Sequence, residues 1–124
     1  MKAISIRPDY AFEILVEKKK REYRSWAPSH RGDLLICSTQ QKIQGTIPGH
    51  ALAVCTLESV EKLSSGGYAW NLTNLRTIKP FPVKGRQHLF NVDDDLIIYS
   101  DLDDASDTKE VNDFVQTNIL PLIV

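Results

Sequence analysis

The chain has 124 residues, of which 42% are hydrophobic and 25% are charged, and its 15 basic residues nearly balance 16 acidic ones. This composition is typical of a soluble globular protein, and the length suits one domain with a single modest core. No apolar run approaches the ~20 residues of a membrane span, and the first residues lack the apolar segment of a signal peptide, so we expect a cytoplasmic protein without membrane contact.

The charge is unevenly distributed along the chain. Residues 1–91 contain 14 of the 15 basic residues and 7 of the 16 acidic ones, a net charge of +7, whereas residues 92–124 have a net charge of −8. A basic body favours a polyanionic partner. The acidic segment is interpreted first as a solvated face, and alternatively as a segment that screens the basic region or competes for it.

Residue patterns with catalytic or metal-binding chemistry are few. Cys37 and Cys55 each lie inside an apolar run, which indicates buried, reduced thiols. The sequence has neither the clustered ligands of a metal site nor a phosphate-binding glycine-rich loop, and its three histidines are scattered. We therefore expect no metal and no cofactor.

Alternating or continuous apolar patterns predict a chain built mainly from short strands. The predicted strands cover residues 2–6, 20–25, 33–39, 50–60, 68–72, 75–81, 88–92 and 96–99. The segment 79–82 contains two prolines and is not expected at the centre of a sheet, because each proline removes a donor from the strand ladder.

Two amphipathic helices are predicted, one near each end of the chain. Pro8 and Asp9 suit a first helical turn, and an apolar stripe follows to about residue 18. Asp107 and Glu110 resemble a capping box, and a second apolar stripe then continues to Pro121.

Many short strands with few helices indicate an α+β fold. We predict a small mixed β-barrel at residues 1–92, with an N-terminal helix. Residues 93–124 are predicted to form an acidic strand and a C-terminal helix that pack on the same domain.

Two basic segments with interspersed aromatic residues are interpreted as the two walls of one cleft. The first covers residues 18–26 and is followed by Arg31, and the second runs from Trp70 to Gln87. Cations interleaved with aromatic rings and turns suit the binding of a backbone phosphate and an unstacked base.

The order of these residues resembles the ASCH domain, a branch of the PUA-like β-barrel superfamily. The resemblance covers about residues 1–92 and is carried by residues 14–26, 31–36, 70–72, 76 and 80–87. It implies a β-barrel with an RNA- or nucleotide-binding cleft between the helix–strand junction and the proline-rich loop. Similar bacterial members hydrolyse N4-acetylcytidine with a lysine and a threonine of the first motif and a downstream glutamate. That lysine position falls on Lys19, and the threonine position falls on Glu22, which has no hydroxyl.

Each candidate site residue in the first wall has a functional and a structural interpretation. Lys19 is a phosphate ligand or a base, or else a solvated member of a run of cations. Glu22 and Arg24 line the floor of the cleft, or form an ion pair that only orients the strand. Trp26 is the candidate for stacking on a base, whereas Trp70 is expected in the core.

The remaining candidates lie in turns. Arg31, beside Gly32, is a phosphate contact or an exposed residue of a β-turn. Lys84 and Arg86 flank Gly85, where backbone N–H groups can approach a phosphate or where the chain makes an ordinary turn.

The sequence therefore favours a domain that binds RNA or a modified nucleoside or nucleotide in a basic cleft. The first alternative is an enzyme, a nucleoside amidohydrolase or a metal-independent ribonuclease, with Lys19 and Glu22 as candidate catalytic residues. The second alternative is a protein-interaction module of a transcription or translation regulator, in which the acidic C-terminal helix docks a protein partner.

Overall fold

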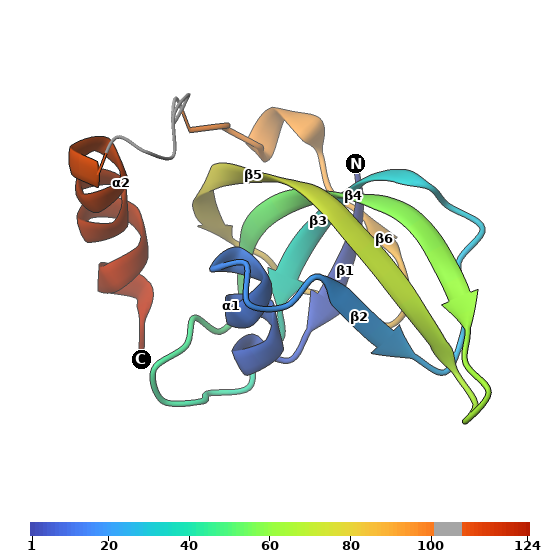
Figure 1. Ribbon diagram of the computed structural model, residues 1–124. Coiled ribbons are helices and arrows are strands. Elements are labelled where there is room, and N and C mark those ends of the chain that lie inside the picture. Colours follow the sequence, from blue (N-terminus) through green and yellow to red (C-terminus); the bar gives the residue numbers. More distant parts are fainter. Residues whose placement is uncertain (101–107) are drawn as a thin grey trace.

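The computed structural model describes residues 1–100 and 108–124, which form one mixed sheet with helices beside it (Figure 1). Residue 107, the first residue of the expected capping box, lies outside the described residues. No helix in the described part of the chain has the length and apolar character that a membrane-spanning helix needs.

Six strands form the sheet, in the spatial order β2-β5-β4-β3-β1-β6. β1 and β3 pair in parallel, and every other neighbouring pair is antiparallel. The strands are β1 (Lys2–Ile6), β2 (Arg21–Arg24), β3 (Gly32–Ser38), β4 (His50–Lys62), β5 (Tyr68–Pro82) and β6 (Phe90–Asn91).

The α+β class is confirmed, but the sheet is not closed into the predicted barrel. β4 and β5 are long, and their pairing shifts register at three places, where such irregularities increase twist and bend a sheet. The two edge strands, β2 and β6, have only four and two residues and do not pair with each other. The strongly curved sheet therefore keeps an open seam between its edges.

The segments predicted as strands 68–72 and 75–81 form one continuous strand, β5. Asn74 lies between the two predicted segments with a left-handed backbone (φ 50°), which asparagine tolerates better than most residues. Pro80 and Pro82 lie beyond the part of β5 that pairs with β2. β5 is an edge strand at that point, in agreement with the expectation that these prolines avoid the centre of a sheet.

The predicted strand at residues 96–99 is wrong. The side chain of Asp93 accepts a hydrogen bond from the backbone N–H of Asp95 at 3.0 Å and caps a turn of 3₁₀ helix at Asp94–Leu96. Among residues 97–100, which follow this turn, Tyr99 forms a single antiparallel bridge with Ile78 of β5. Local capping by an aspartate overcame the strand preference of the apolar residues that follow.

Both faces of the sheet are buried, which explains the continuous apolar run of β3. Leu34 and Ile36 belong to one core cluster, whereas Leu35 and Cys37 belong to a second cluster on the opposite face. Trp70 is fully buried in the first cluster, so its assignment to the core is confirmed. Both cysteines are buried as well: Cys37 lies in the second cluster and Cys55 in the first.

The helices cover the first core cluster. α1 (Pro8–Leu15) is shorter than predicted and buries Ala11 and Ile14. The C-terminal helix starts as α2 (Thr108–Phe114) and continues as a π-helical turn at Val115–Ile119 and a 3₁₀ turn at Leu120–Leu122. It lies beside the sheet in Figure 1, with Ile119 buried in the first cluster.

Candidate ligand-binding cleft

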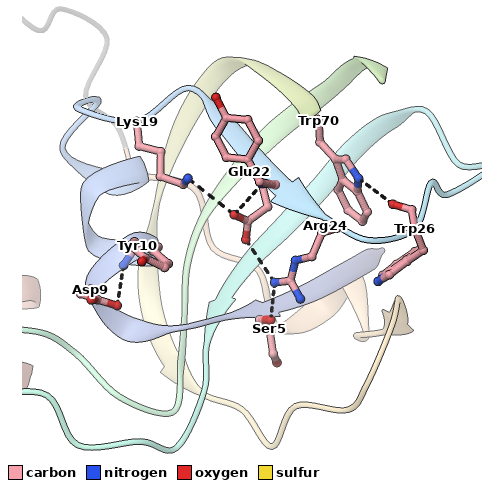
Figure 2. A network of polar contacts seen from close by, with 9 residues as sticks. Ser5, Asp9, Tyr10, Lys19, Glu22, Arg24, Trp26 and Trp70 are labelled. Atoms are coloured by element: carbon pink, nitrogen blue, oxygen red, sulfur yellow. Dashed lines mark hydrogen bonds and ion pairs between the residues drawn. The ribbon is translucent and has the colours of Figure 1, made fainter. Parts of the chain in front are cut away.

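The candidate site lies at the open seam of the sheet. β6 pairs with β1 only at Lys2 and Ala3, so Ser5 lies beyond the end of that pairing. Arg24, on the opposite edge strand β2, donates a hydrogen bond from Nη2 to the carbonyl oxygen of Ser5 at 3.0 Å (Figure 2). A side chain therefore links the two edges that backbone pairing leaves apart.

Glu22 is the centre of the polar network at this seam. The strand alternation of β2 puts Glu22 and Arg24 on the same face, as the sequence predicts. One carboxylate oxygen of Glu22 accepts from Arg24 Nη2 at 3.1 Å, and the other lies 3.6 Å from the Lys19 Nζ and accepts from the Tyr23 backbone N–H at 3.0 Å. Its side chain is only 6% exposed, so these partners compensate for the removal of its charge from water.

Lys19 is held between two aromatic rings. Its ammonium lies 5.2 Å from the ring centre of Tyr10 and 4.9 Å from that of Tyr23, within the range of cation–π attraction. Arg7 lies 5.7 Å from the Tyr10 ring, and Arg21 lies 5.9 Å from the Tyr23 ring. Cations and rings thus alternate along the mouth of the site.

Two pockets with shared walls form the cleft. The first pocket, of about 490 Å³, lies between the start of α1, residues 19–24 and Thr39. The second pocket, of about 360 Å³, shares Ser5, Arg24 and Thr39 with it and extends to residues 85–88. Among the described residues, three cations (Arg7, Lys19 and Arg24) and one carboxylate (Glu22) line the first pocket, an excess of two positive charges. Such a pocket favours an anionic or acceptor-rich ligand.

Trp26 packs against residues of the core and the cleft without lining either pocket. Its ring contacts Trp70 edge-on at 4.9 Å and His88 at 4.9 Å, and its carbonyl oxygen accepts from the Trp70 indole N–H at 3.2 Å. His88 lines the second pocket, whereas Trp26 lines neither pocket. Of these two rings, that of His88 is therefore the one accessible to a ligand in the cleft.

The other predicted residues separate into two groups. Arg86 lines the second pocket and also a third pocket of about 680 Å³. Lys84 lines only the third pocket. Arg31 lines none of the three, and its guanidinium donates hydrogen bonds to the backbone carbonyls of Pro28 and His30, both at 2.8 Å. The structure thus gathers Lys19, Glu22, Arg24 and Arg86, but not Arg31.

Several residues of the cleft were not found by reasoning from the sequence. Ser5 is the fourth of the five residues of β1, and Thr39 directly follows β3; the Thr39 N–H donates to the Ile6 carbonyl at 2.9 Å. Because β1 and β3 are parallel, their carboxyl ends lie side by side at the same end of the sheet, where ligand sites commonly form. Small hydroxyl residues near the carboxyl ends of two apolar strands were the available signal in the sequence, but this signal has meaning only once the parallel pairing of the strands is known.

The two thiols are poorly suited to nucleophilic catalysis. Burial raises the pKa of Cys37 and that of Cys55 to about 12, so both remain protonated thiols near neutral pH. Among residues 1–100 and 108–124, no group of three or more His, Cys, Asp or Glu side chains is arranged to hold a metal ion.

Comparison with known proteins identifies the fold. The sequence profile described as the ASCH domain matches residues 4–116, and so extends beyond residue 92, to which the resemblance was expected to reach. A comparison with curated proteins finds no match.

Crystal structures of an ASCH protein from Zymomonas mobilis share the fold. One has a TM-score of 0.60 at 17% identity and covers 76% of this chain and 88% of that chain. A serine-to-alanine variant has a TM-score of 0.59 at 14% identity and covers 94% of both chains. A tyrosine-to-phenylalanine variant has a TM-score of 0.59 at 16% identity and covers 93% of this chain and 96% of that chain.

Proposed function

Because the chain belongs to the ASCH domain family, we propose that its cleft binds RNA or a modified nucleoside or nucleotide. The family is generally linked to RNA binding, and the positive excess in the first pocket supports the same class of ligand. We also infer a relationship to the PUA-like barrels, supported by the contact between Arg24 and Ser5 at the seam where a closed sheet would pair its edges.

One observation carries the proposal: the buried Glu22 carboxylate is held between Lys19 and Arg24 at the floor of the first pocket. The carboxylate fixes both cations in position. The Lys19 ammonium, at 3.6 Å from Glu22 and otherwise between two tyrosine rings, keeps donor capacity for a phosphate or a carbonyl oxygen. The tyrosine rings provide the apolar walls that a base requires.

The size of the first pocket limits the form of the ligand. Its volume of about 490 Å³ lies in the range of small-ligand pockets, which is roughly 300–1,000 Å³. An unstacked base or a free nucleoside fits such a volume, but a duplex groove cannot be read from within it. We therefore propose recognition of single-stranded or flipped nucleotides.

A titration of ribonucleoside 5′-monophosphates and a short single-stranded RNA pool tests the proposal. Lys19→Ala is expected to weaken binding about ten- to a hundredfold, because a charge-assisted hydrogen bond contributes roughly 1.5–3 kcal/mol. Lys62→Ala, which removes an exposed lysine that lines none of the three pockets, is the matched control. Equal affinity of the wild type and Lys19→Ala would contradict the proposal.

Hydrolysis of a modified nucleoside is the second candidate, because a hydroxyl group is available in the first pocket. Glu22 occupies the position at which the N4-acetylcytidine hydrolases have a threonine, but Thr39 lines the same pocket as Lys19 and Glu22. Amide hydrolysis would add water to the acetyl carbonyl carbon and break its bond to N4, which yields acetate and cytidine. Release of cytidine from N4-acetylcytidine by the wild type, and its loss in Thr39→Val, would establish this activity; an unchanged substrate would exclude it.

A further inference from the structure

We propose that the ligand of the cleft is a stretch of single-stranded RNA, which runs from the first pocket across residues 83–88 into the third pocket. This inference rests on the proposed function and extends it from one nucleotide to several. It assigns a binding role to Lys84, Gln87 and the third pocket, which lie outside the Glu22 network.

Continuity of the three pockets is the first argument. The first and second pockets share Ser5, Arg24 and Thr39, and the second and third share Arg86 and Gln87. Their volumes of about 490, 360 and 680 Å³ each lie in the range of a small-ligand site. A single nucleoside leaves most of this groove empty, whereas a strand of linked nucleotides can fill it.

The wall that separates the second and third pockets is fixed in place, which is the second argument. Gln40 donates from Nε2 to the Val83 carbonyl at 3.0 Å, and the Val83 N–H donates to the Gly49 carbonyl at 3.0 Å. Gly85 packs so closely that a Cβ there would lie 1.9 Å from the Ser5 Oγ. A groove formed before binding avoids the cost of ordering a loop around the ligand.

The charge along the groove is the third argument. Lys19 and Arg24 line the first pocket, and Arg86 and Lys84 continue the row of cations into the third. Arg86 and Gln87 are exposed, so their donors are accessible to phosphate oxygens and base edges. Among the described residues that line the third pocket, Asp93 is the single carboxylate. A basic groove that tracks the backbone is the usual arrangement for binding a single strand.

Binding as a function of RNA length tests the inference. The probes are the four ribonucleoside 5′-monophosphates and single-stranded RNA pools of two, four and eight nucleotides, each titrated into the wild type, a Lys84→Ala/Arg86→Ala double variant, Lys19→Ala and Lys62→Ala. For the wild type we expect the dissociation constant to fall about tenfold from the dinucleotides to the octanucleotides, because further phosphates are contacted.

The double variant is expected to bind the octanucleotides roughly tenfold more weakly than the wild type, a loss near the upper limit for the removal of two exposed ion pairs. Its affinity for the monophosphates is expected to fall less than about twofold. Its plot of log affinity against log salt concentration should be shallower by about 0.7 for each cation removed. Both substituted side chains are exposed, so folding is expected to be retained.

The outcomes separate this inference from the proposed function. Lys19-dependent binding of monophosphates without any gain in affinity with length, or a double variant that binds octanucleotides as the wild type does, would overturn the extended groove alone. Absence of binding by every probe, or binding unaffected by Lys19→Ala, would overturn both.

Discussion

Arg24 of the edge strand β2 and Ser5, in the part of β1 that the other edge strand β6 leaves unpaired, are joined by a hydrogen bond of 3.0 Å from the guanidinium Nη2 to the Ser5 carbonyl oxygen. The same nitrogen lies 3.1 Å from the Glu22 carboxylate. One side chain therefore bridges the seam and orients the central charged group of the cleft. This arrangement makes the binding site and the stability of the seam mutually dependent.

Arg24→Ala is expected to lower the free energy of unfolding by about 1–3 kcal/mol, because the buried Glu22 loses a charged partner and the Ser5 carbonyl loses its donor. The variant should still fold, since small domains commonly have 5–15 kcal/mol of stability. Urea unfolding measures the change. Arg21→Ala is the control, because Arg21 pairs with Glu61 at 2.7 Å on the exposed surface and should cost less than about 1 kcal/mol. Equal losses in the two variants would contradict a special role for the seam.

The aromatic ring of Tyr23, and not its hydroxyl, is expected to hold Lys19 in position. The ring centre lies 4.9 Å from the ammonium, and such a contact contributes roughly 0.5–1 kcal/mol. Tyr23→Ala should therefore weaken nucleotide binding about two- to fivefold, whereas Tyr23→Phe should bind as the wild type does. Titration calorimetry with the two variants measures the difference. A loss of binding in Tyr23→Phe would instead assign the function to the hydroxyl.

Gly85→Ala is expected to displace the wall of the second pocket, because the new Cβ would lie 1.9 Å from the Ser5 Oγ and 2.9 Å from its Cβ. Overpacking of this kind typically costs about 1–3 kcal/mol. Ser5→Gly removes both of the contacted atoms, so the double variant should recover part of the loss. A double-mutant cycle of unfolding free energies checks the coupling, for which about 0.5–3 kcal/mol is typical of residues in contact. Strictly additive effects would show that the two residues do not constrain each other.

Much of the fold could be predicted from the sequence, but the cleft could be predicted only in part. Apolar alternation located most of the strands, and the charged alternation of Lys20, Glu22 and Arg24 placed the last two on one face of β2. The open seam was not predictable, because it depends on the edge strands β2 and β6 being too short to pair. Strand length at an edge depends on tertiary packing more than on local pattern.

Which of the candidate cations lie at the cleft could also not be predicted from the sequence. Arg31 has the same residue type and a similar turn context as Arg86, but its guanidinium is occupied by two backbone carbonyls. Tyr10 lies nine positions before Lys19 in the sequence, and only the turn after α1 brings its ring to the ammonium. Such contacts arise from the path of the chain, which residue spacing does not specify.

Replacement of Arg76 should make the free energy of unfolding less sensitive to a fall in pH. The hydrogen bond from Arg76 to Asp33, at 2.8 Å, holds the pKa of Asp33 below its usual value. A carboxylate with a depressed folded-state pKa stabilises the protein above its unfolded-state pKa of about 3.9, and this stabilisation is lost as the pH falls through the folded-state value. The stability difference between the wild type and Arg76→Gln should therefore shrink below about pH 4. Urea midpoints from pH 7 to pH 2.5 measure it, and Asp33→Asn should remove the effect. The side chain of Asp33 is half exposed, so solvent screening keeps the contribution small.

Docking of the C-terminal helix is tested by two adjacent residues with opposite exposure. Ile119 is 6% exposed and belongs to the first core cluster, whereas Leu120 is 48% exposed. Ile119→Ala should lower the free energy of unfolding by about 2–4 kcal/mol, because it removes buried methylenes and leaves a cavity. Leu120→Ala should change it by less than about 0.5 kcal/mol. The backbone N–H of Val124 also donates to the Thr46 carbonyl at 3.0 Å, which ties the end of the helix segment to the body. If the two alanine variants unfold at the same urea concentration, the Ile119 side chain contributes no packing energy and the predicted role of its burial is wrong.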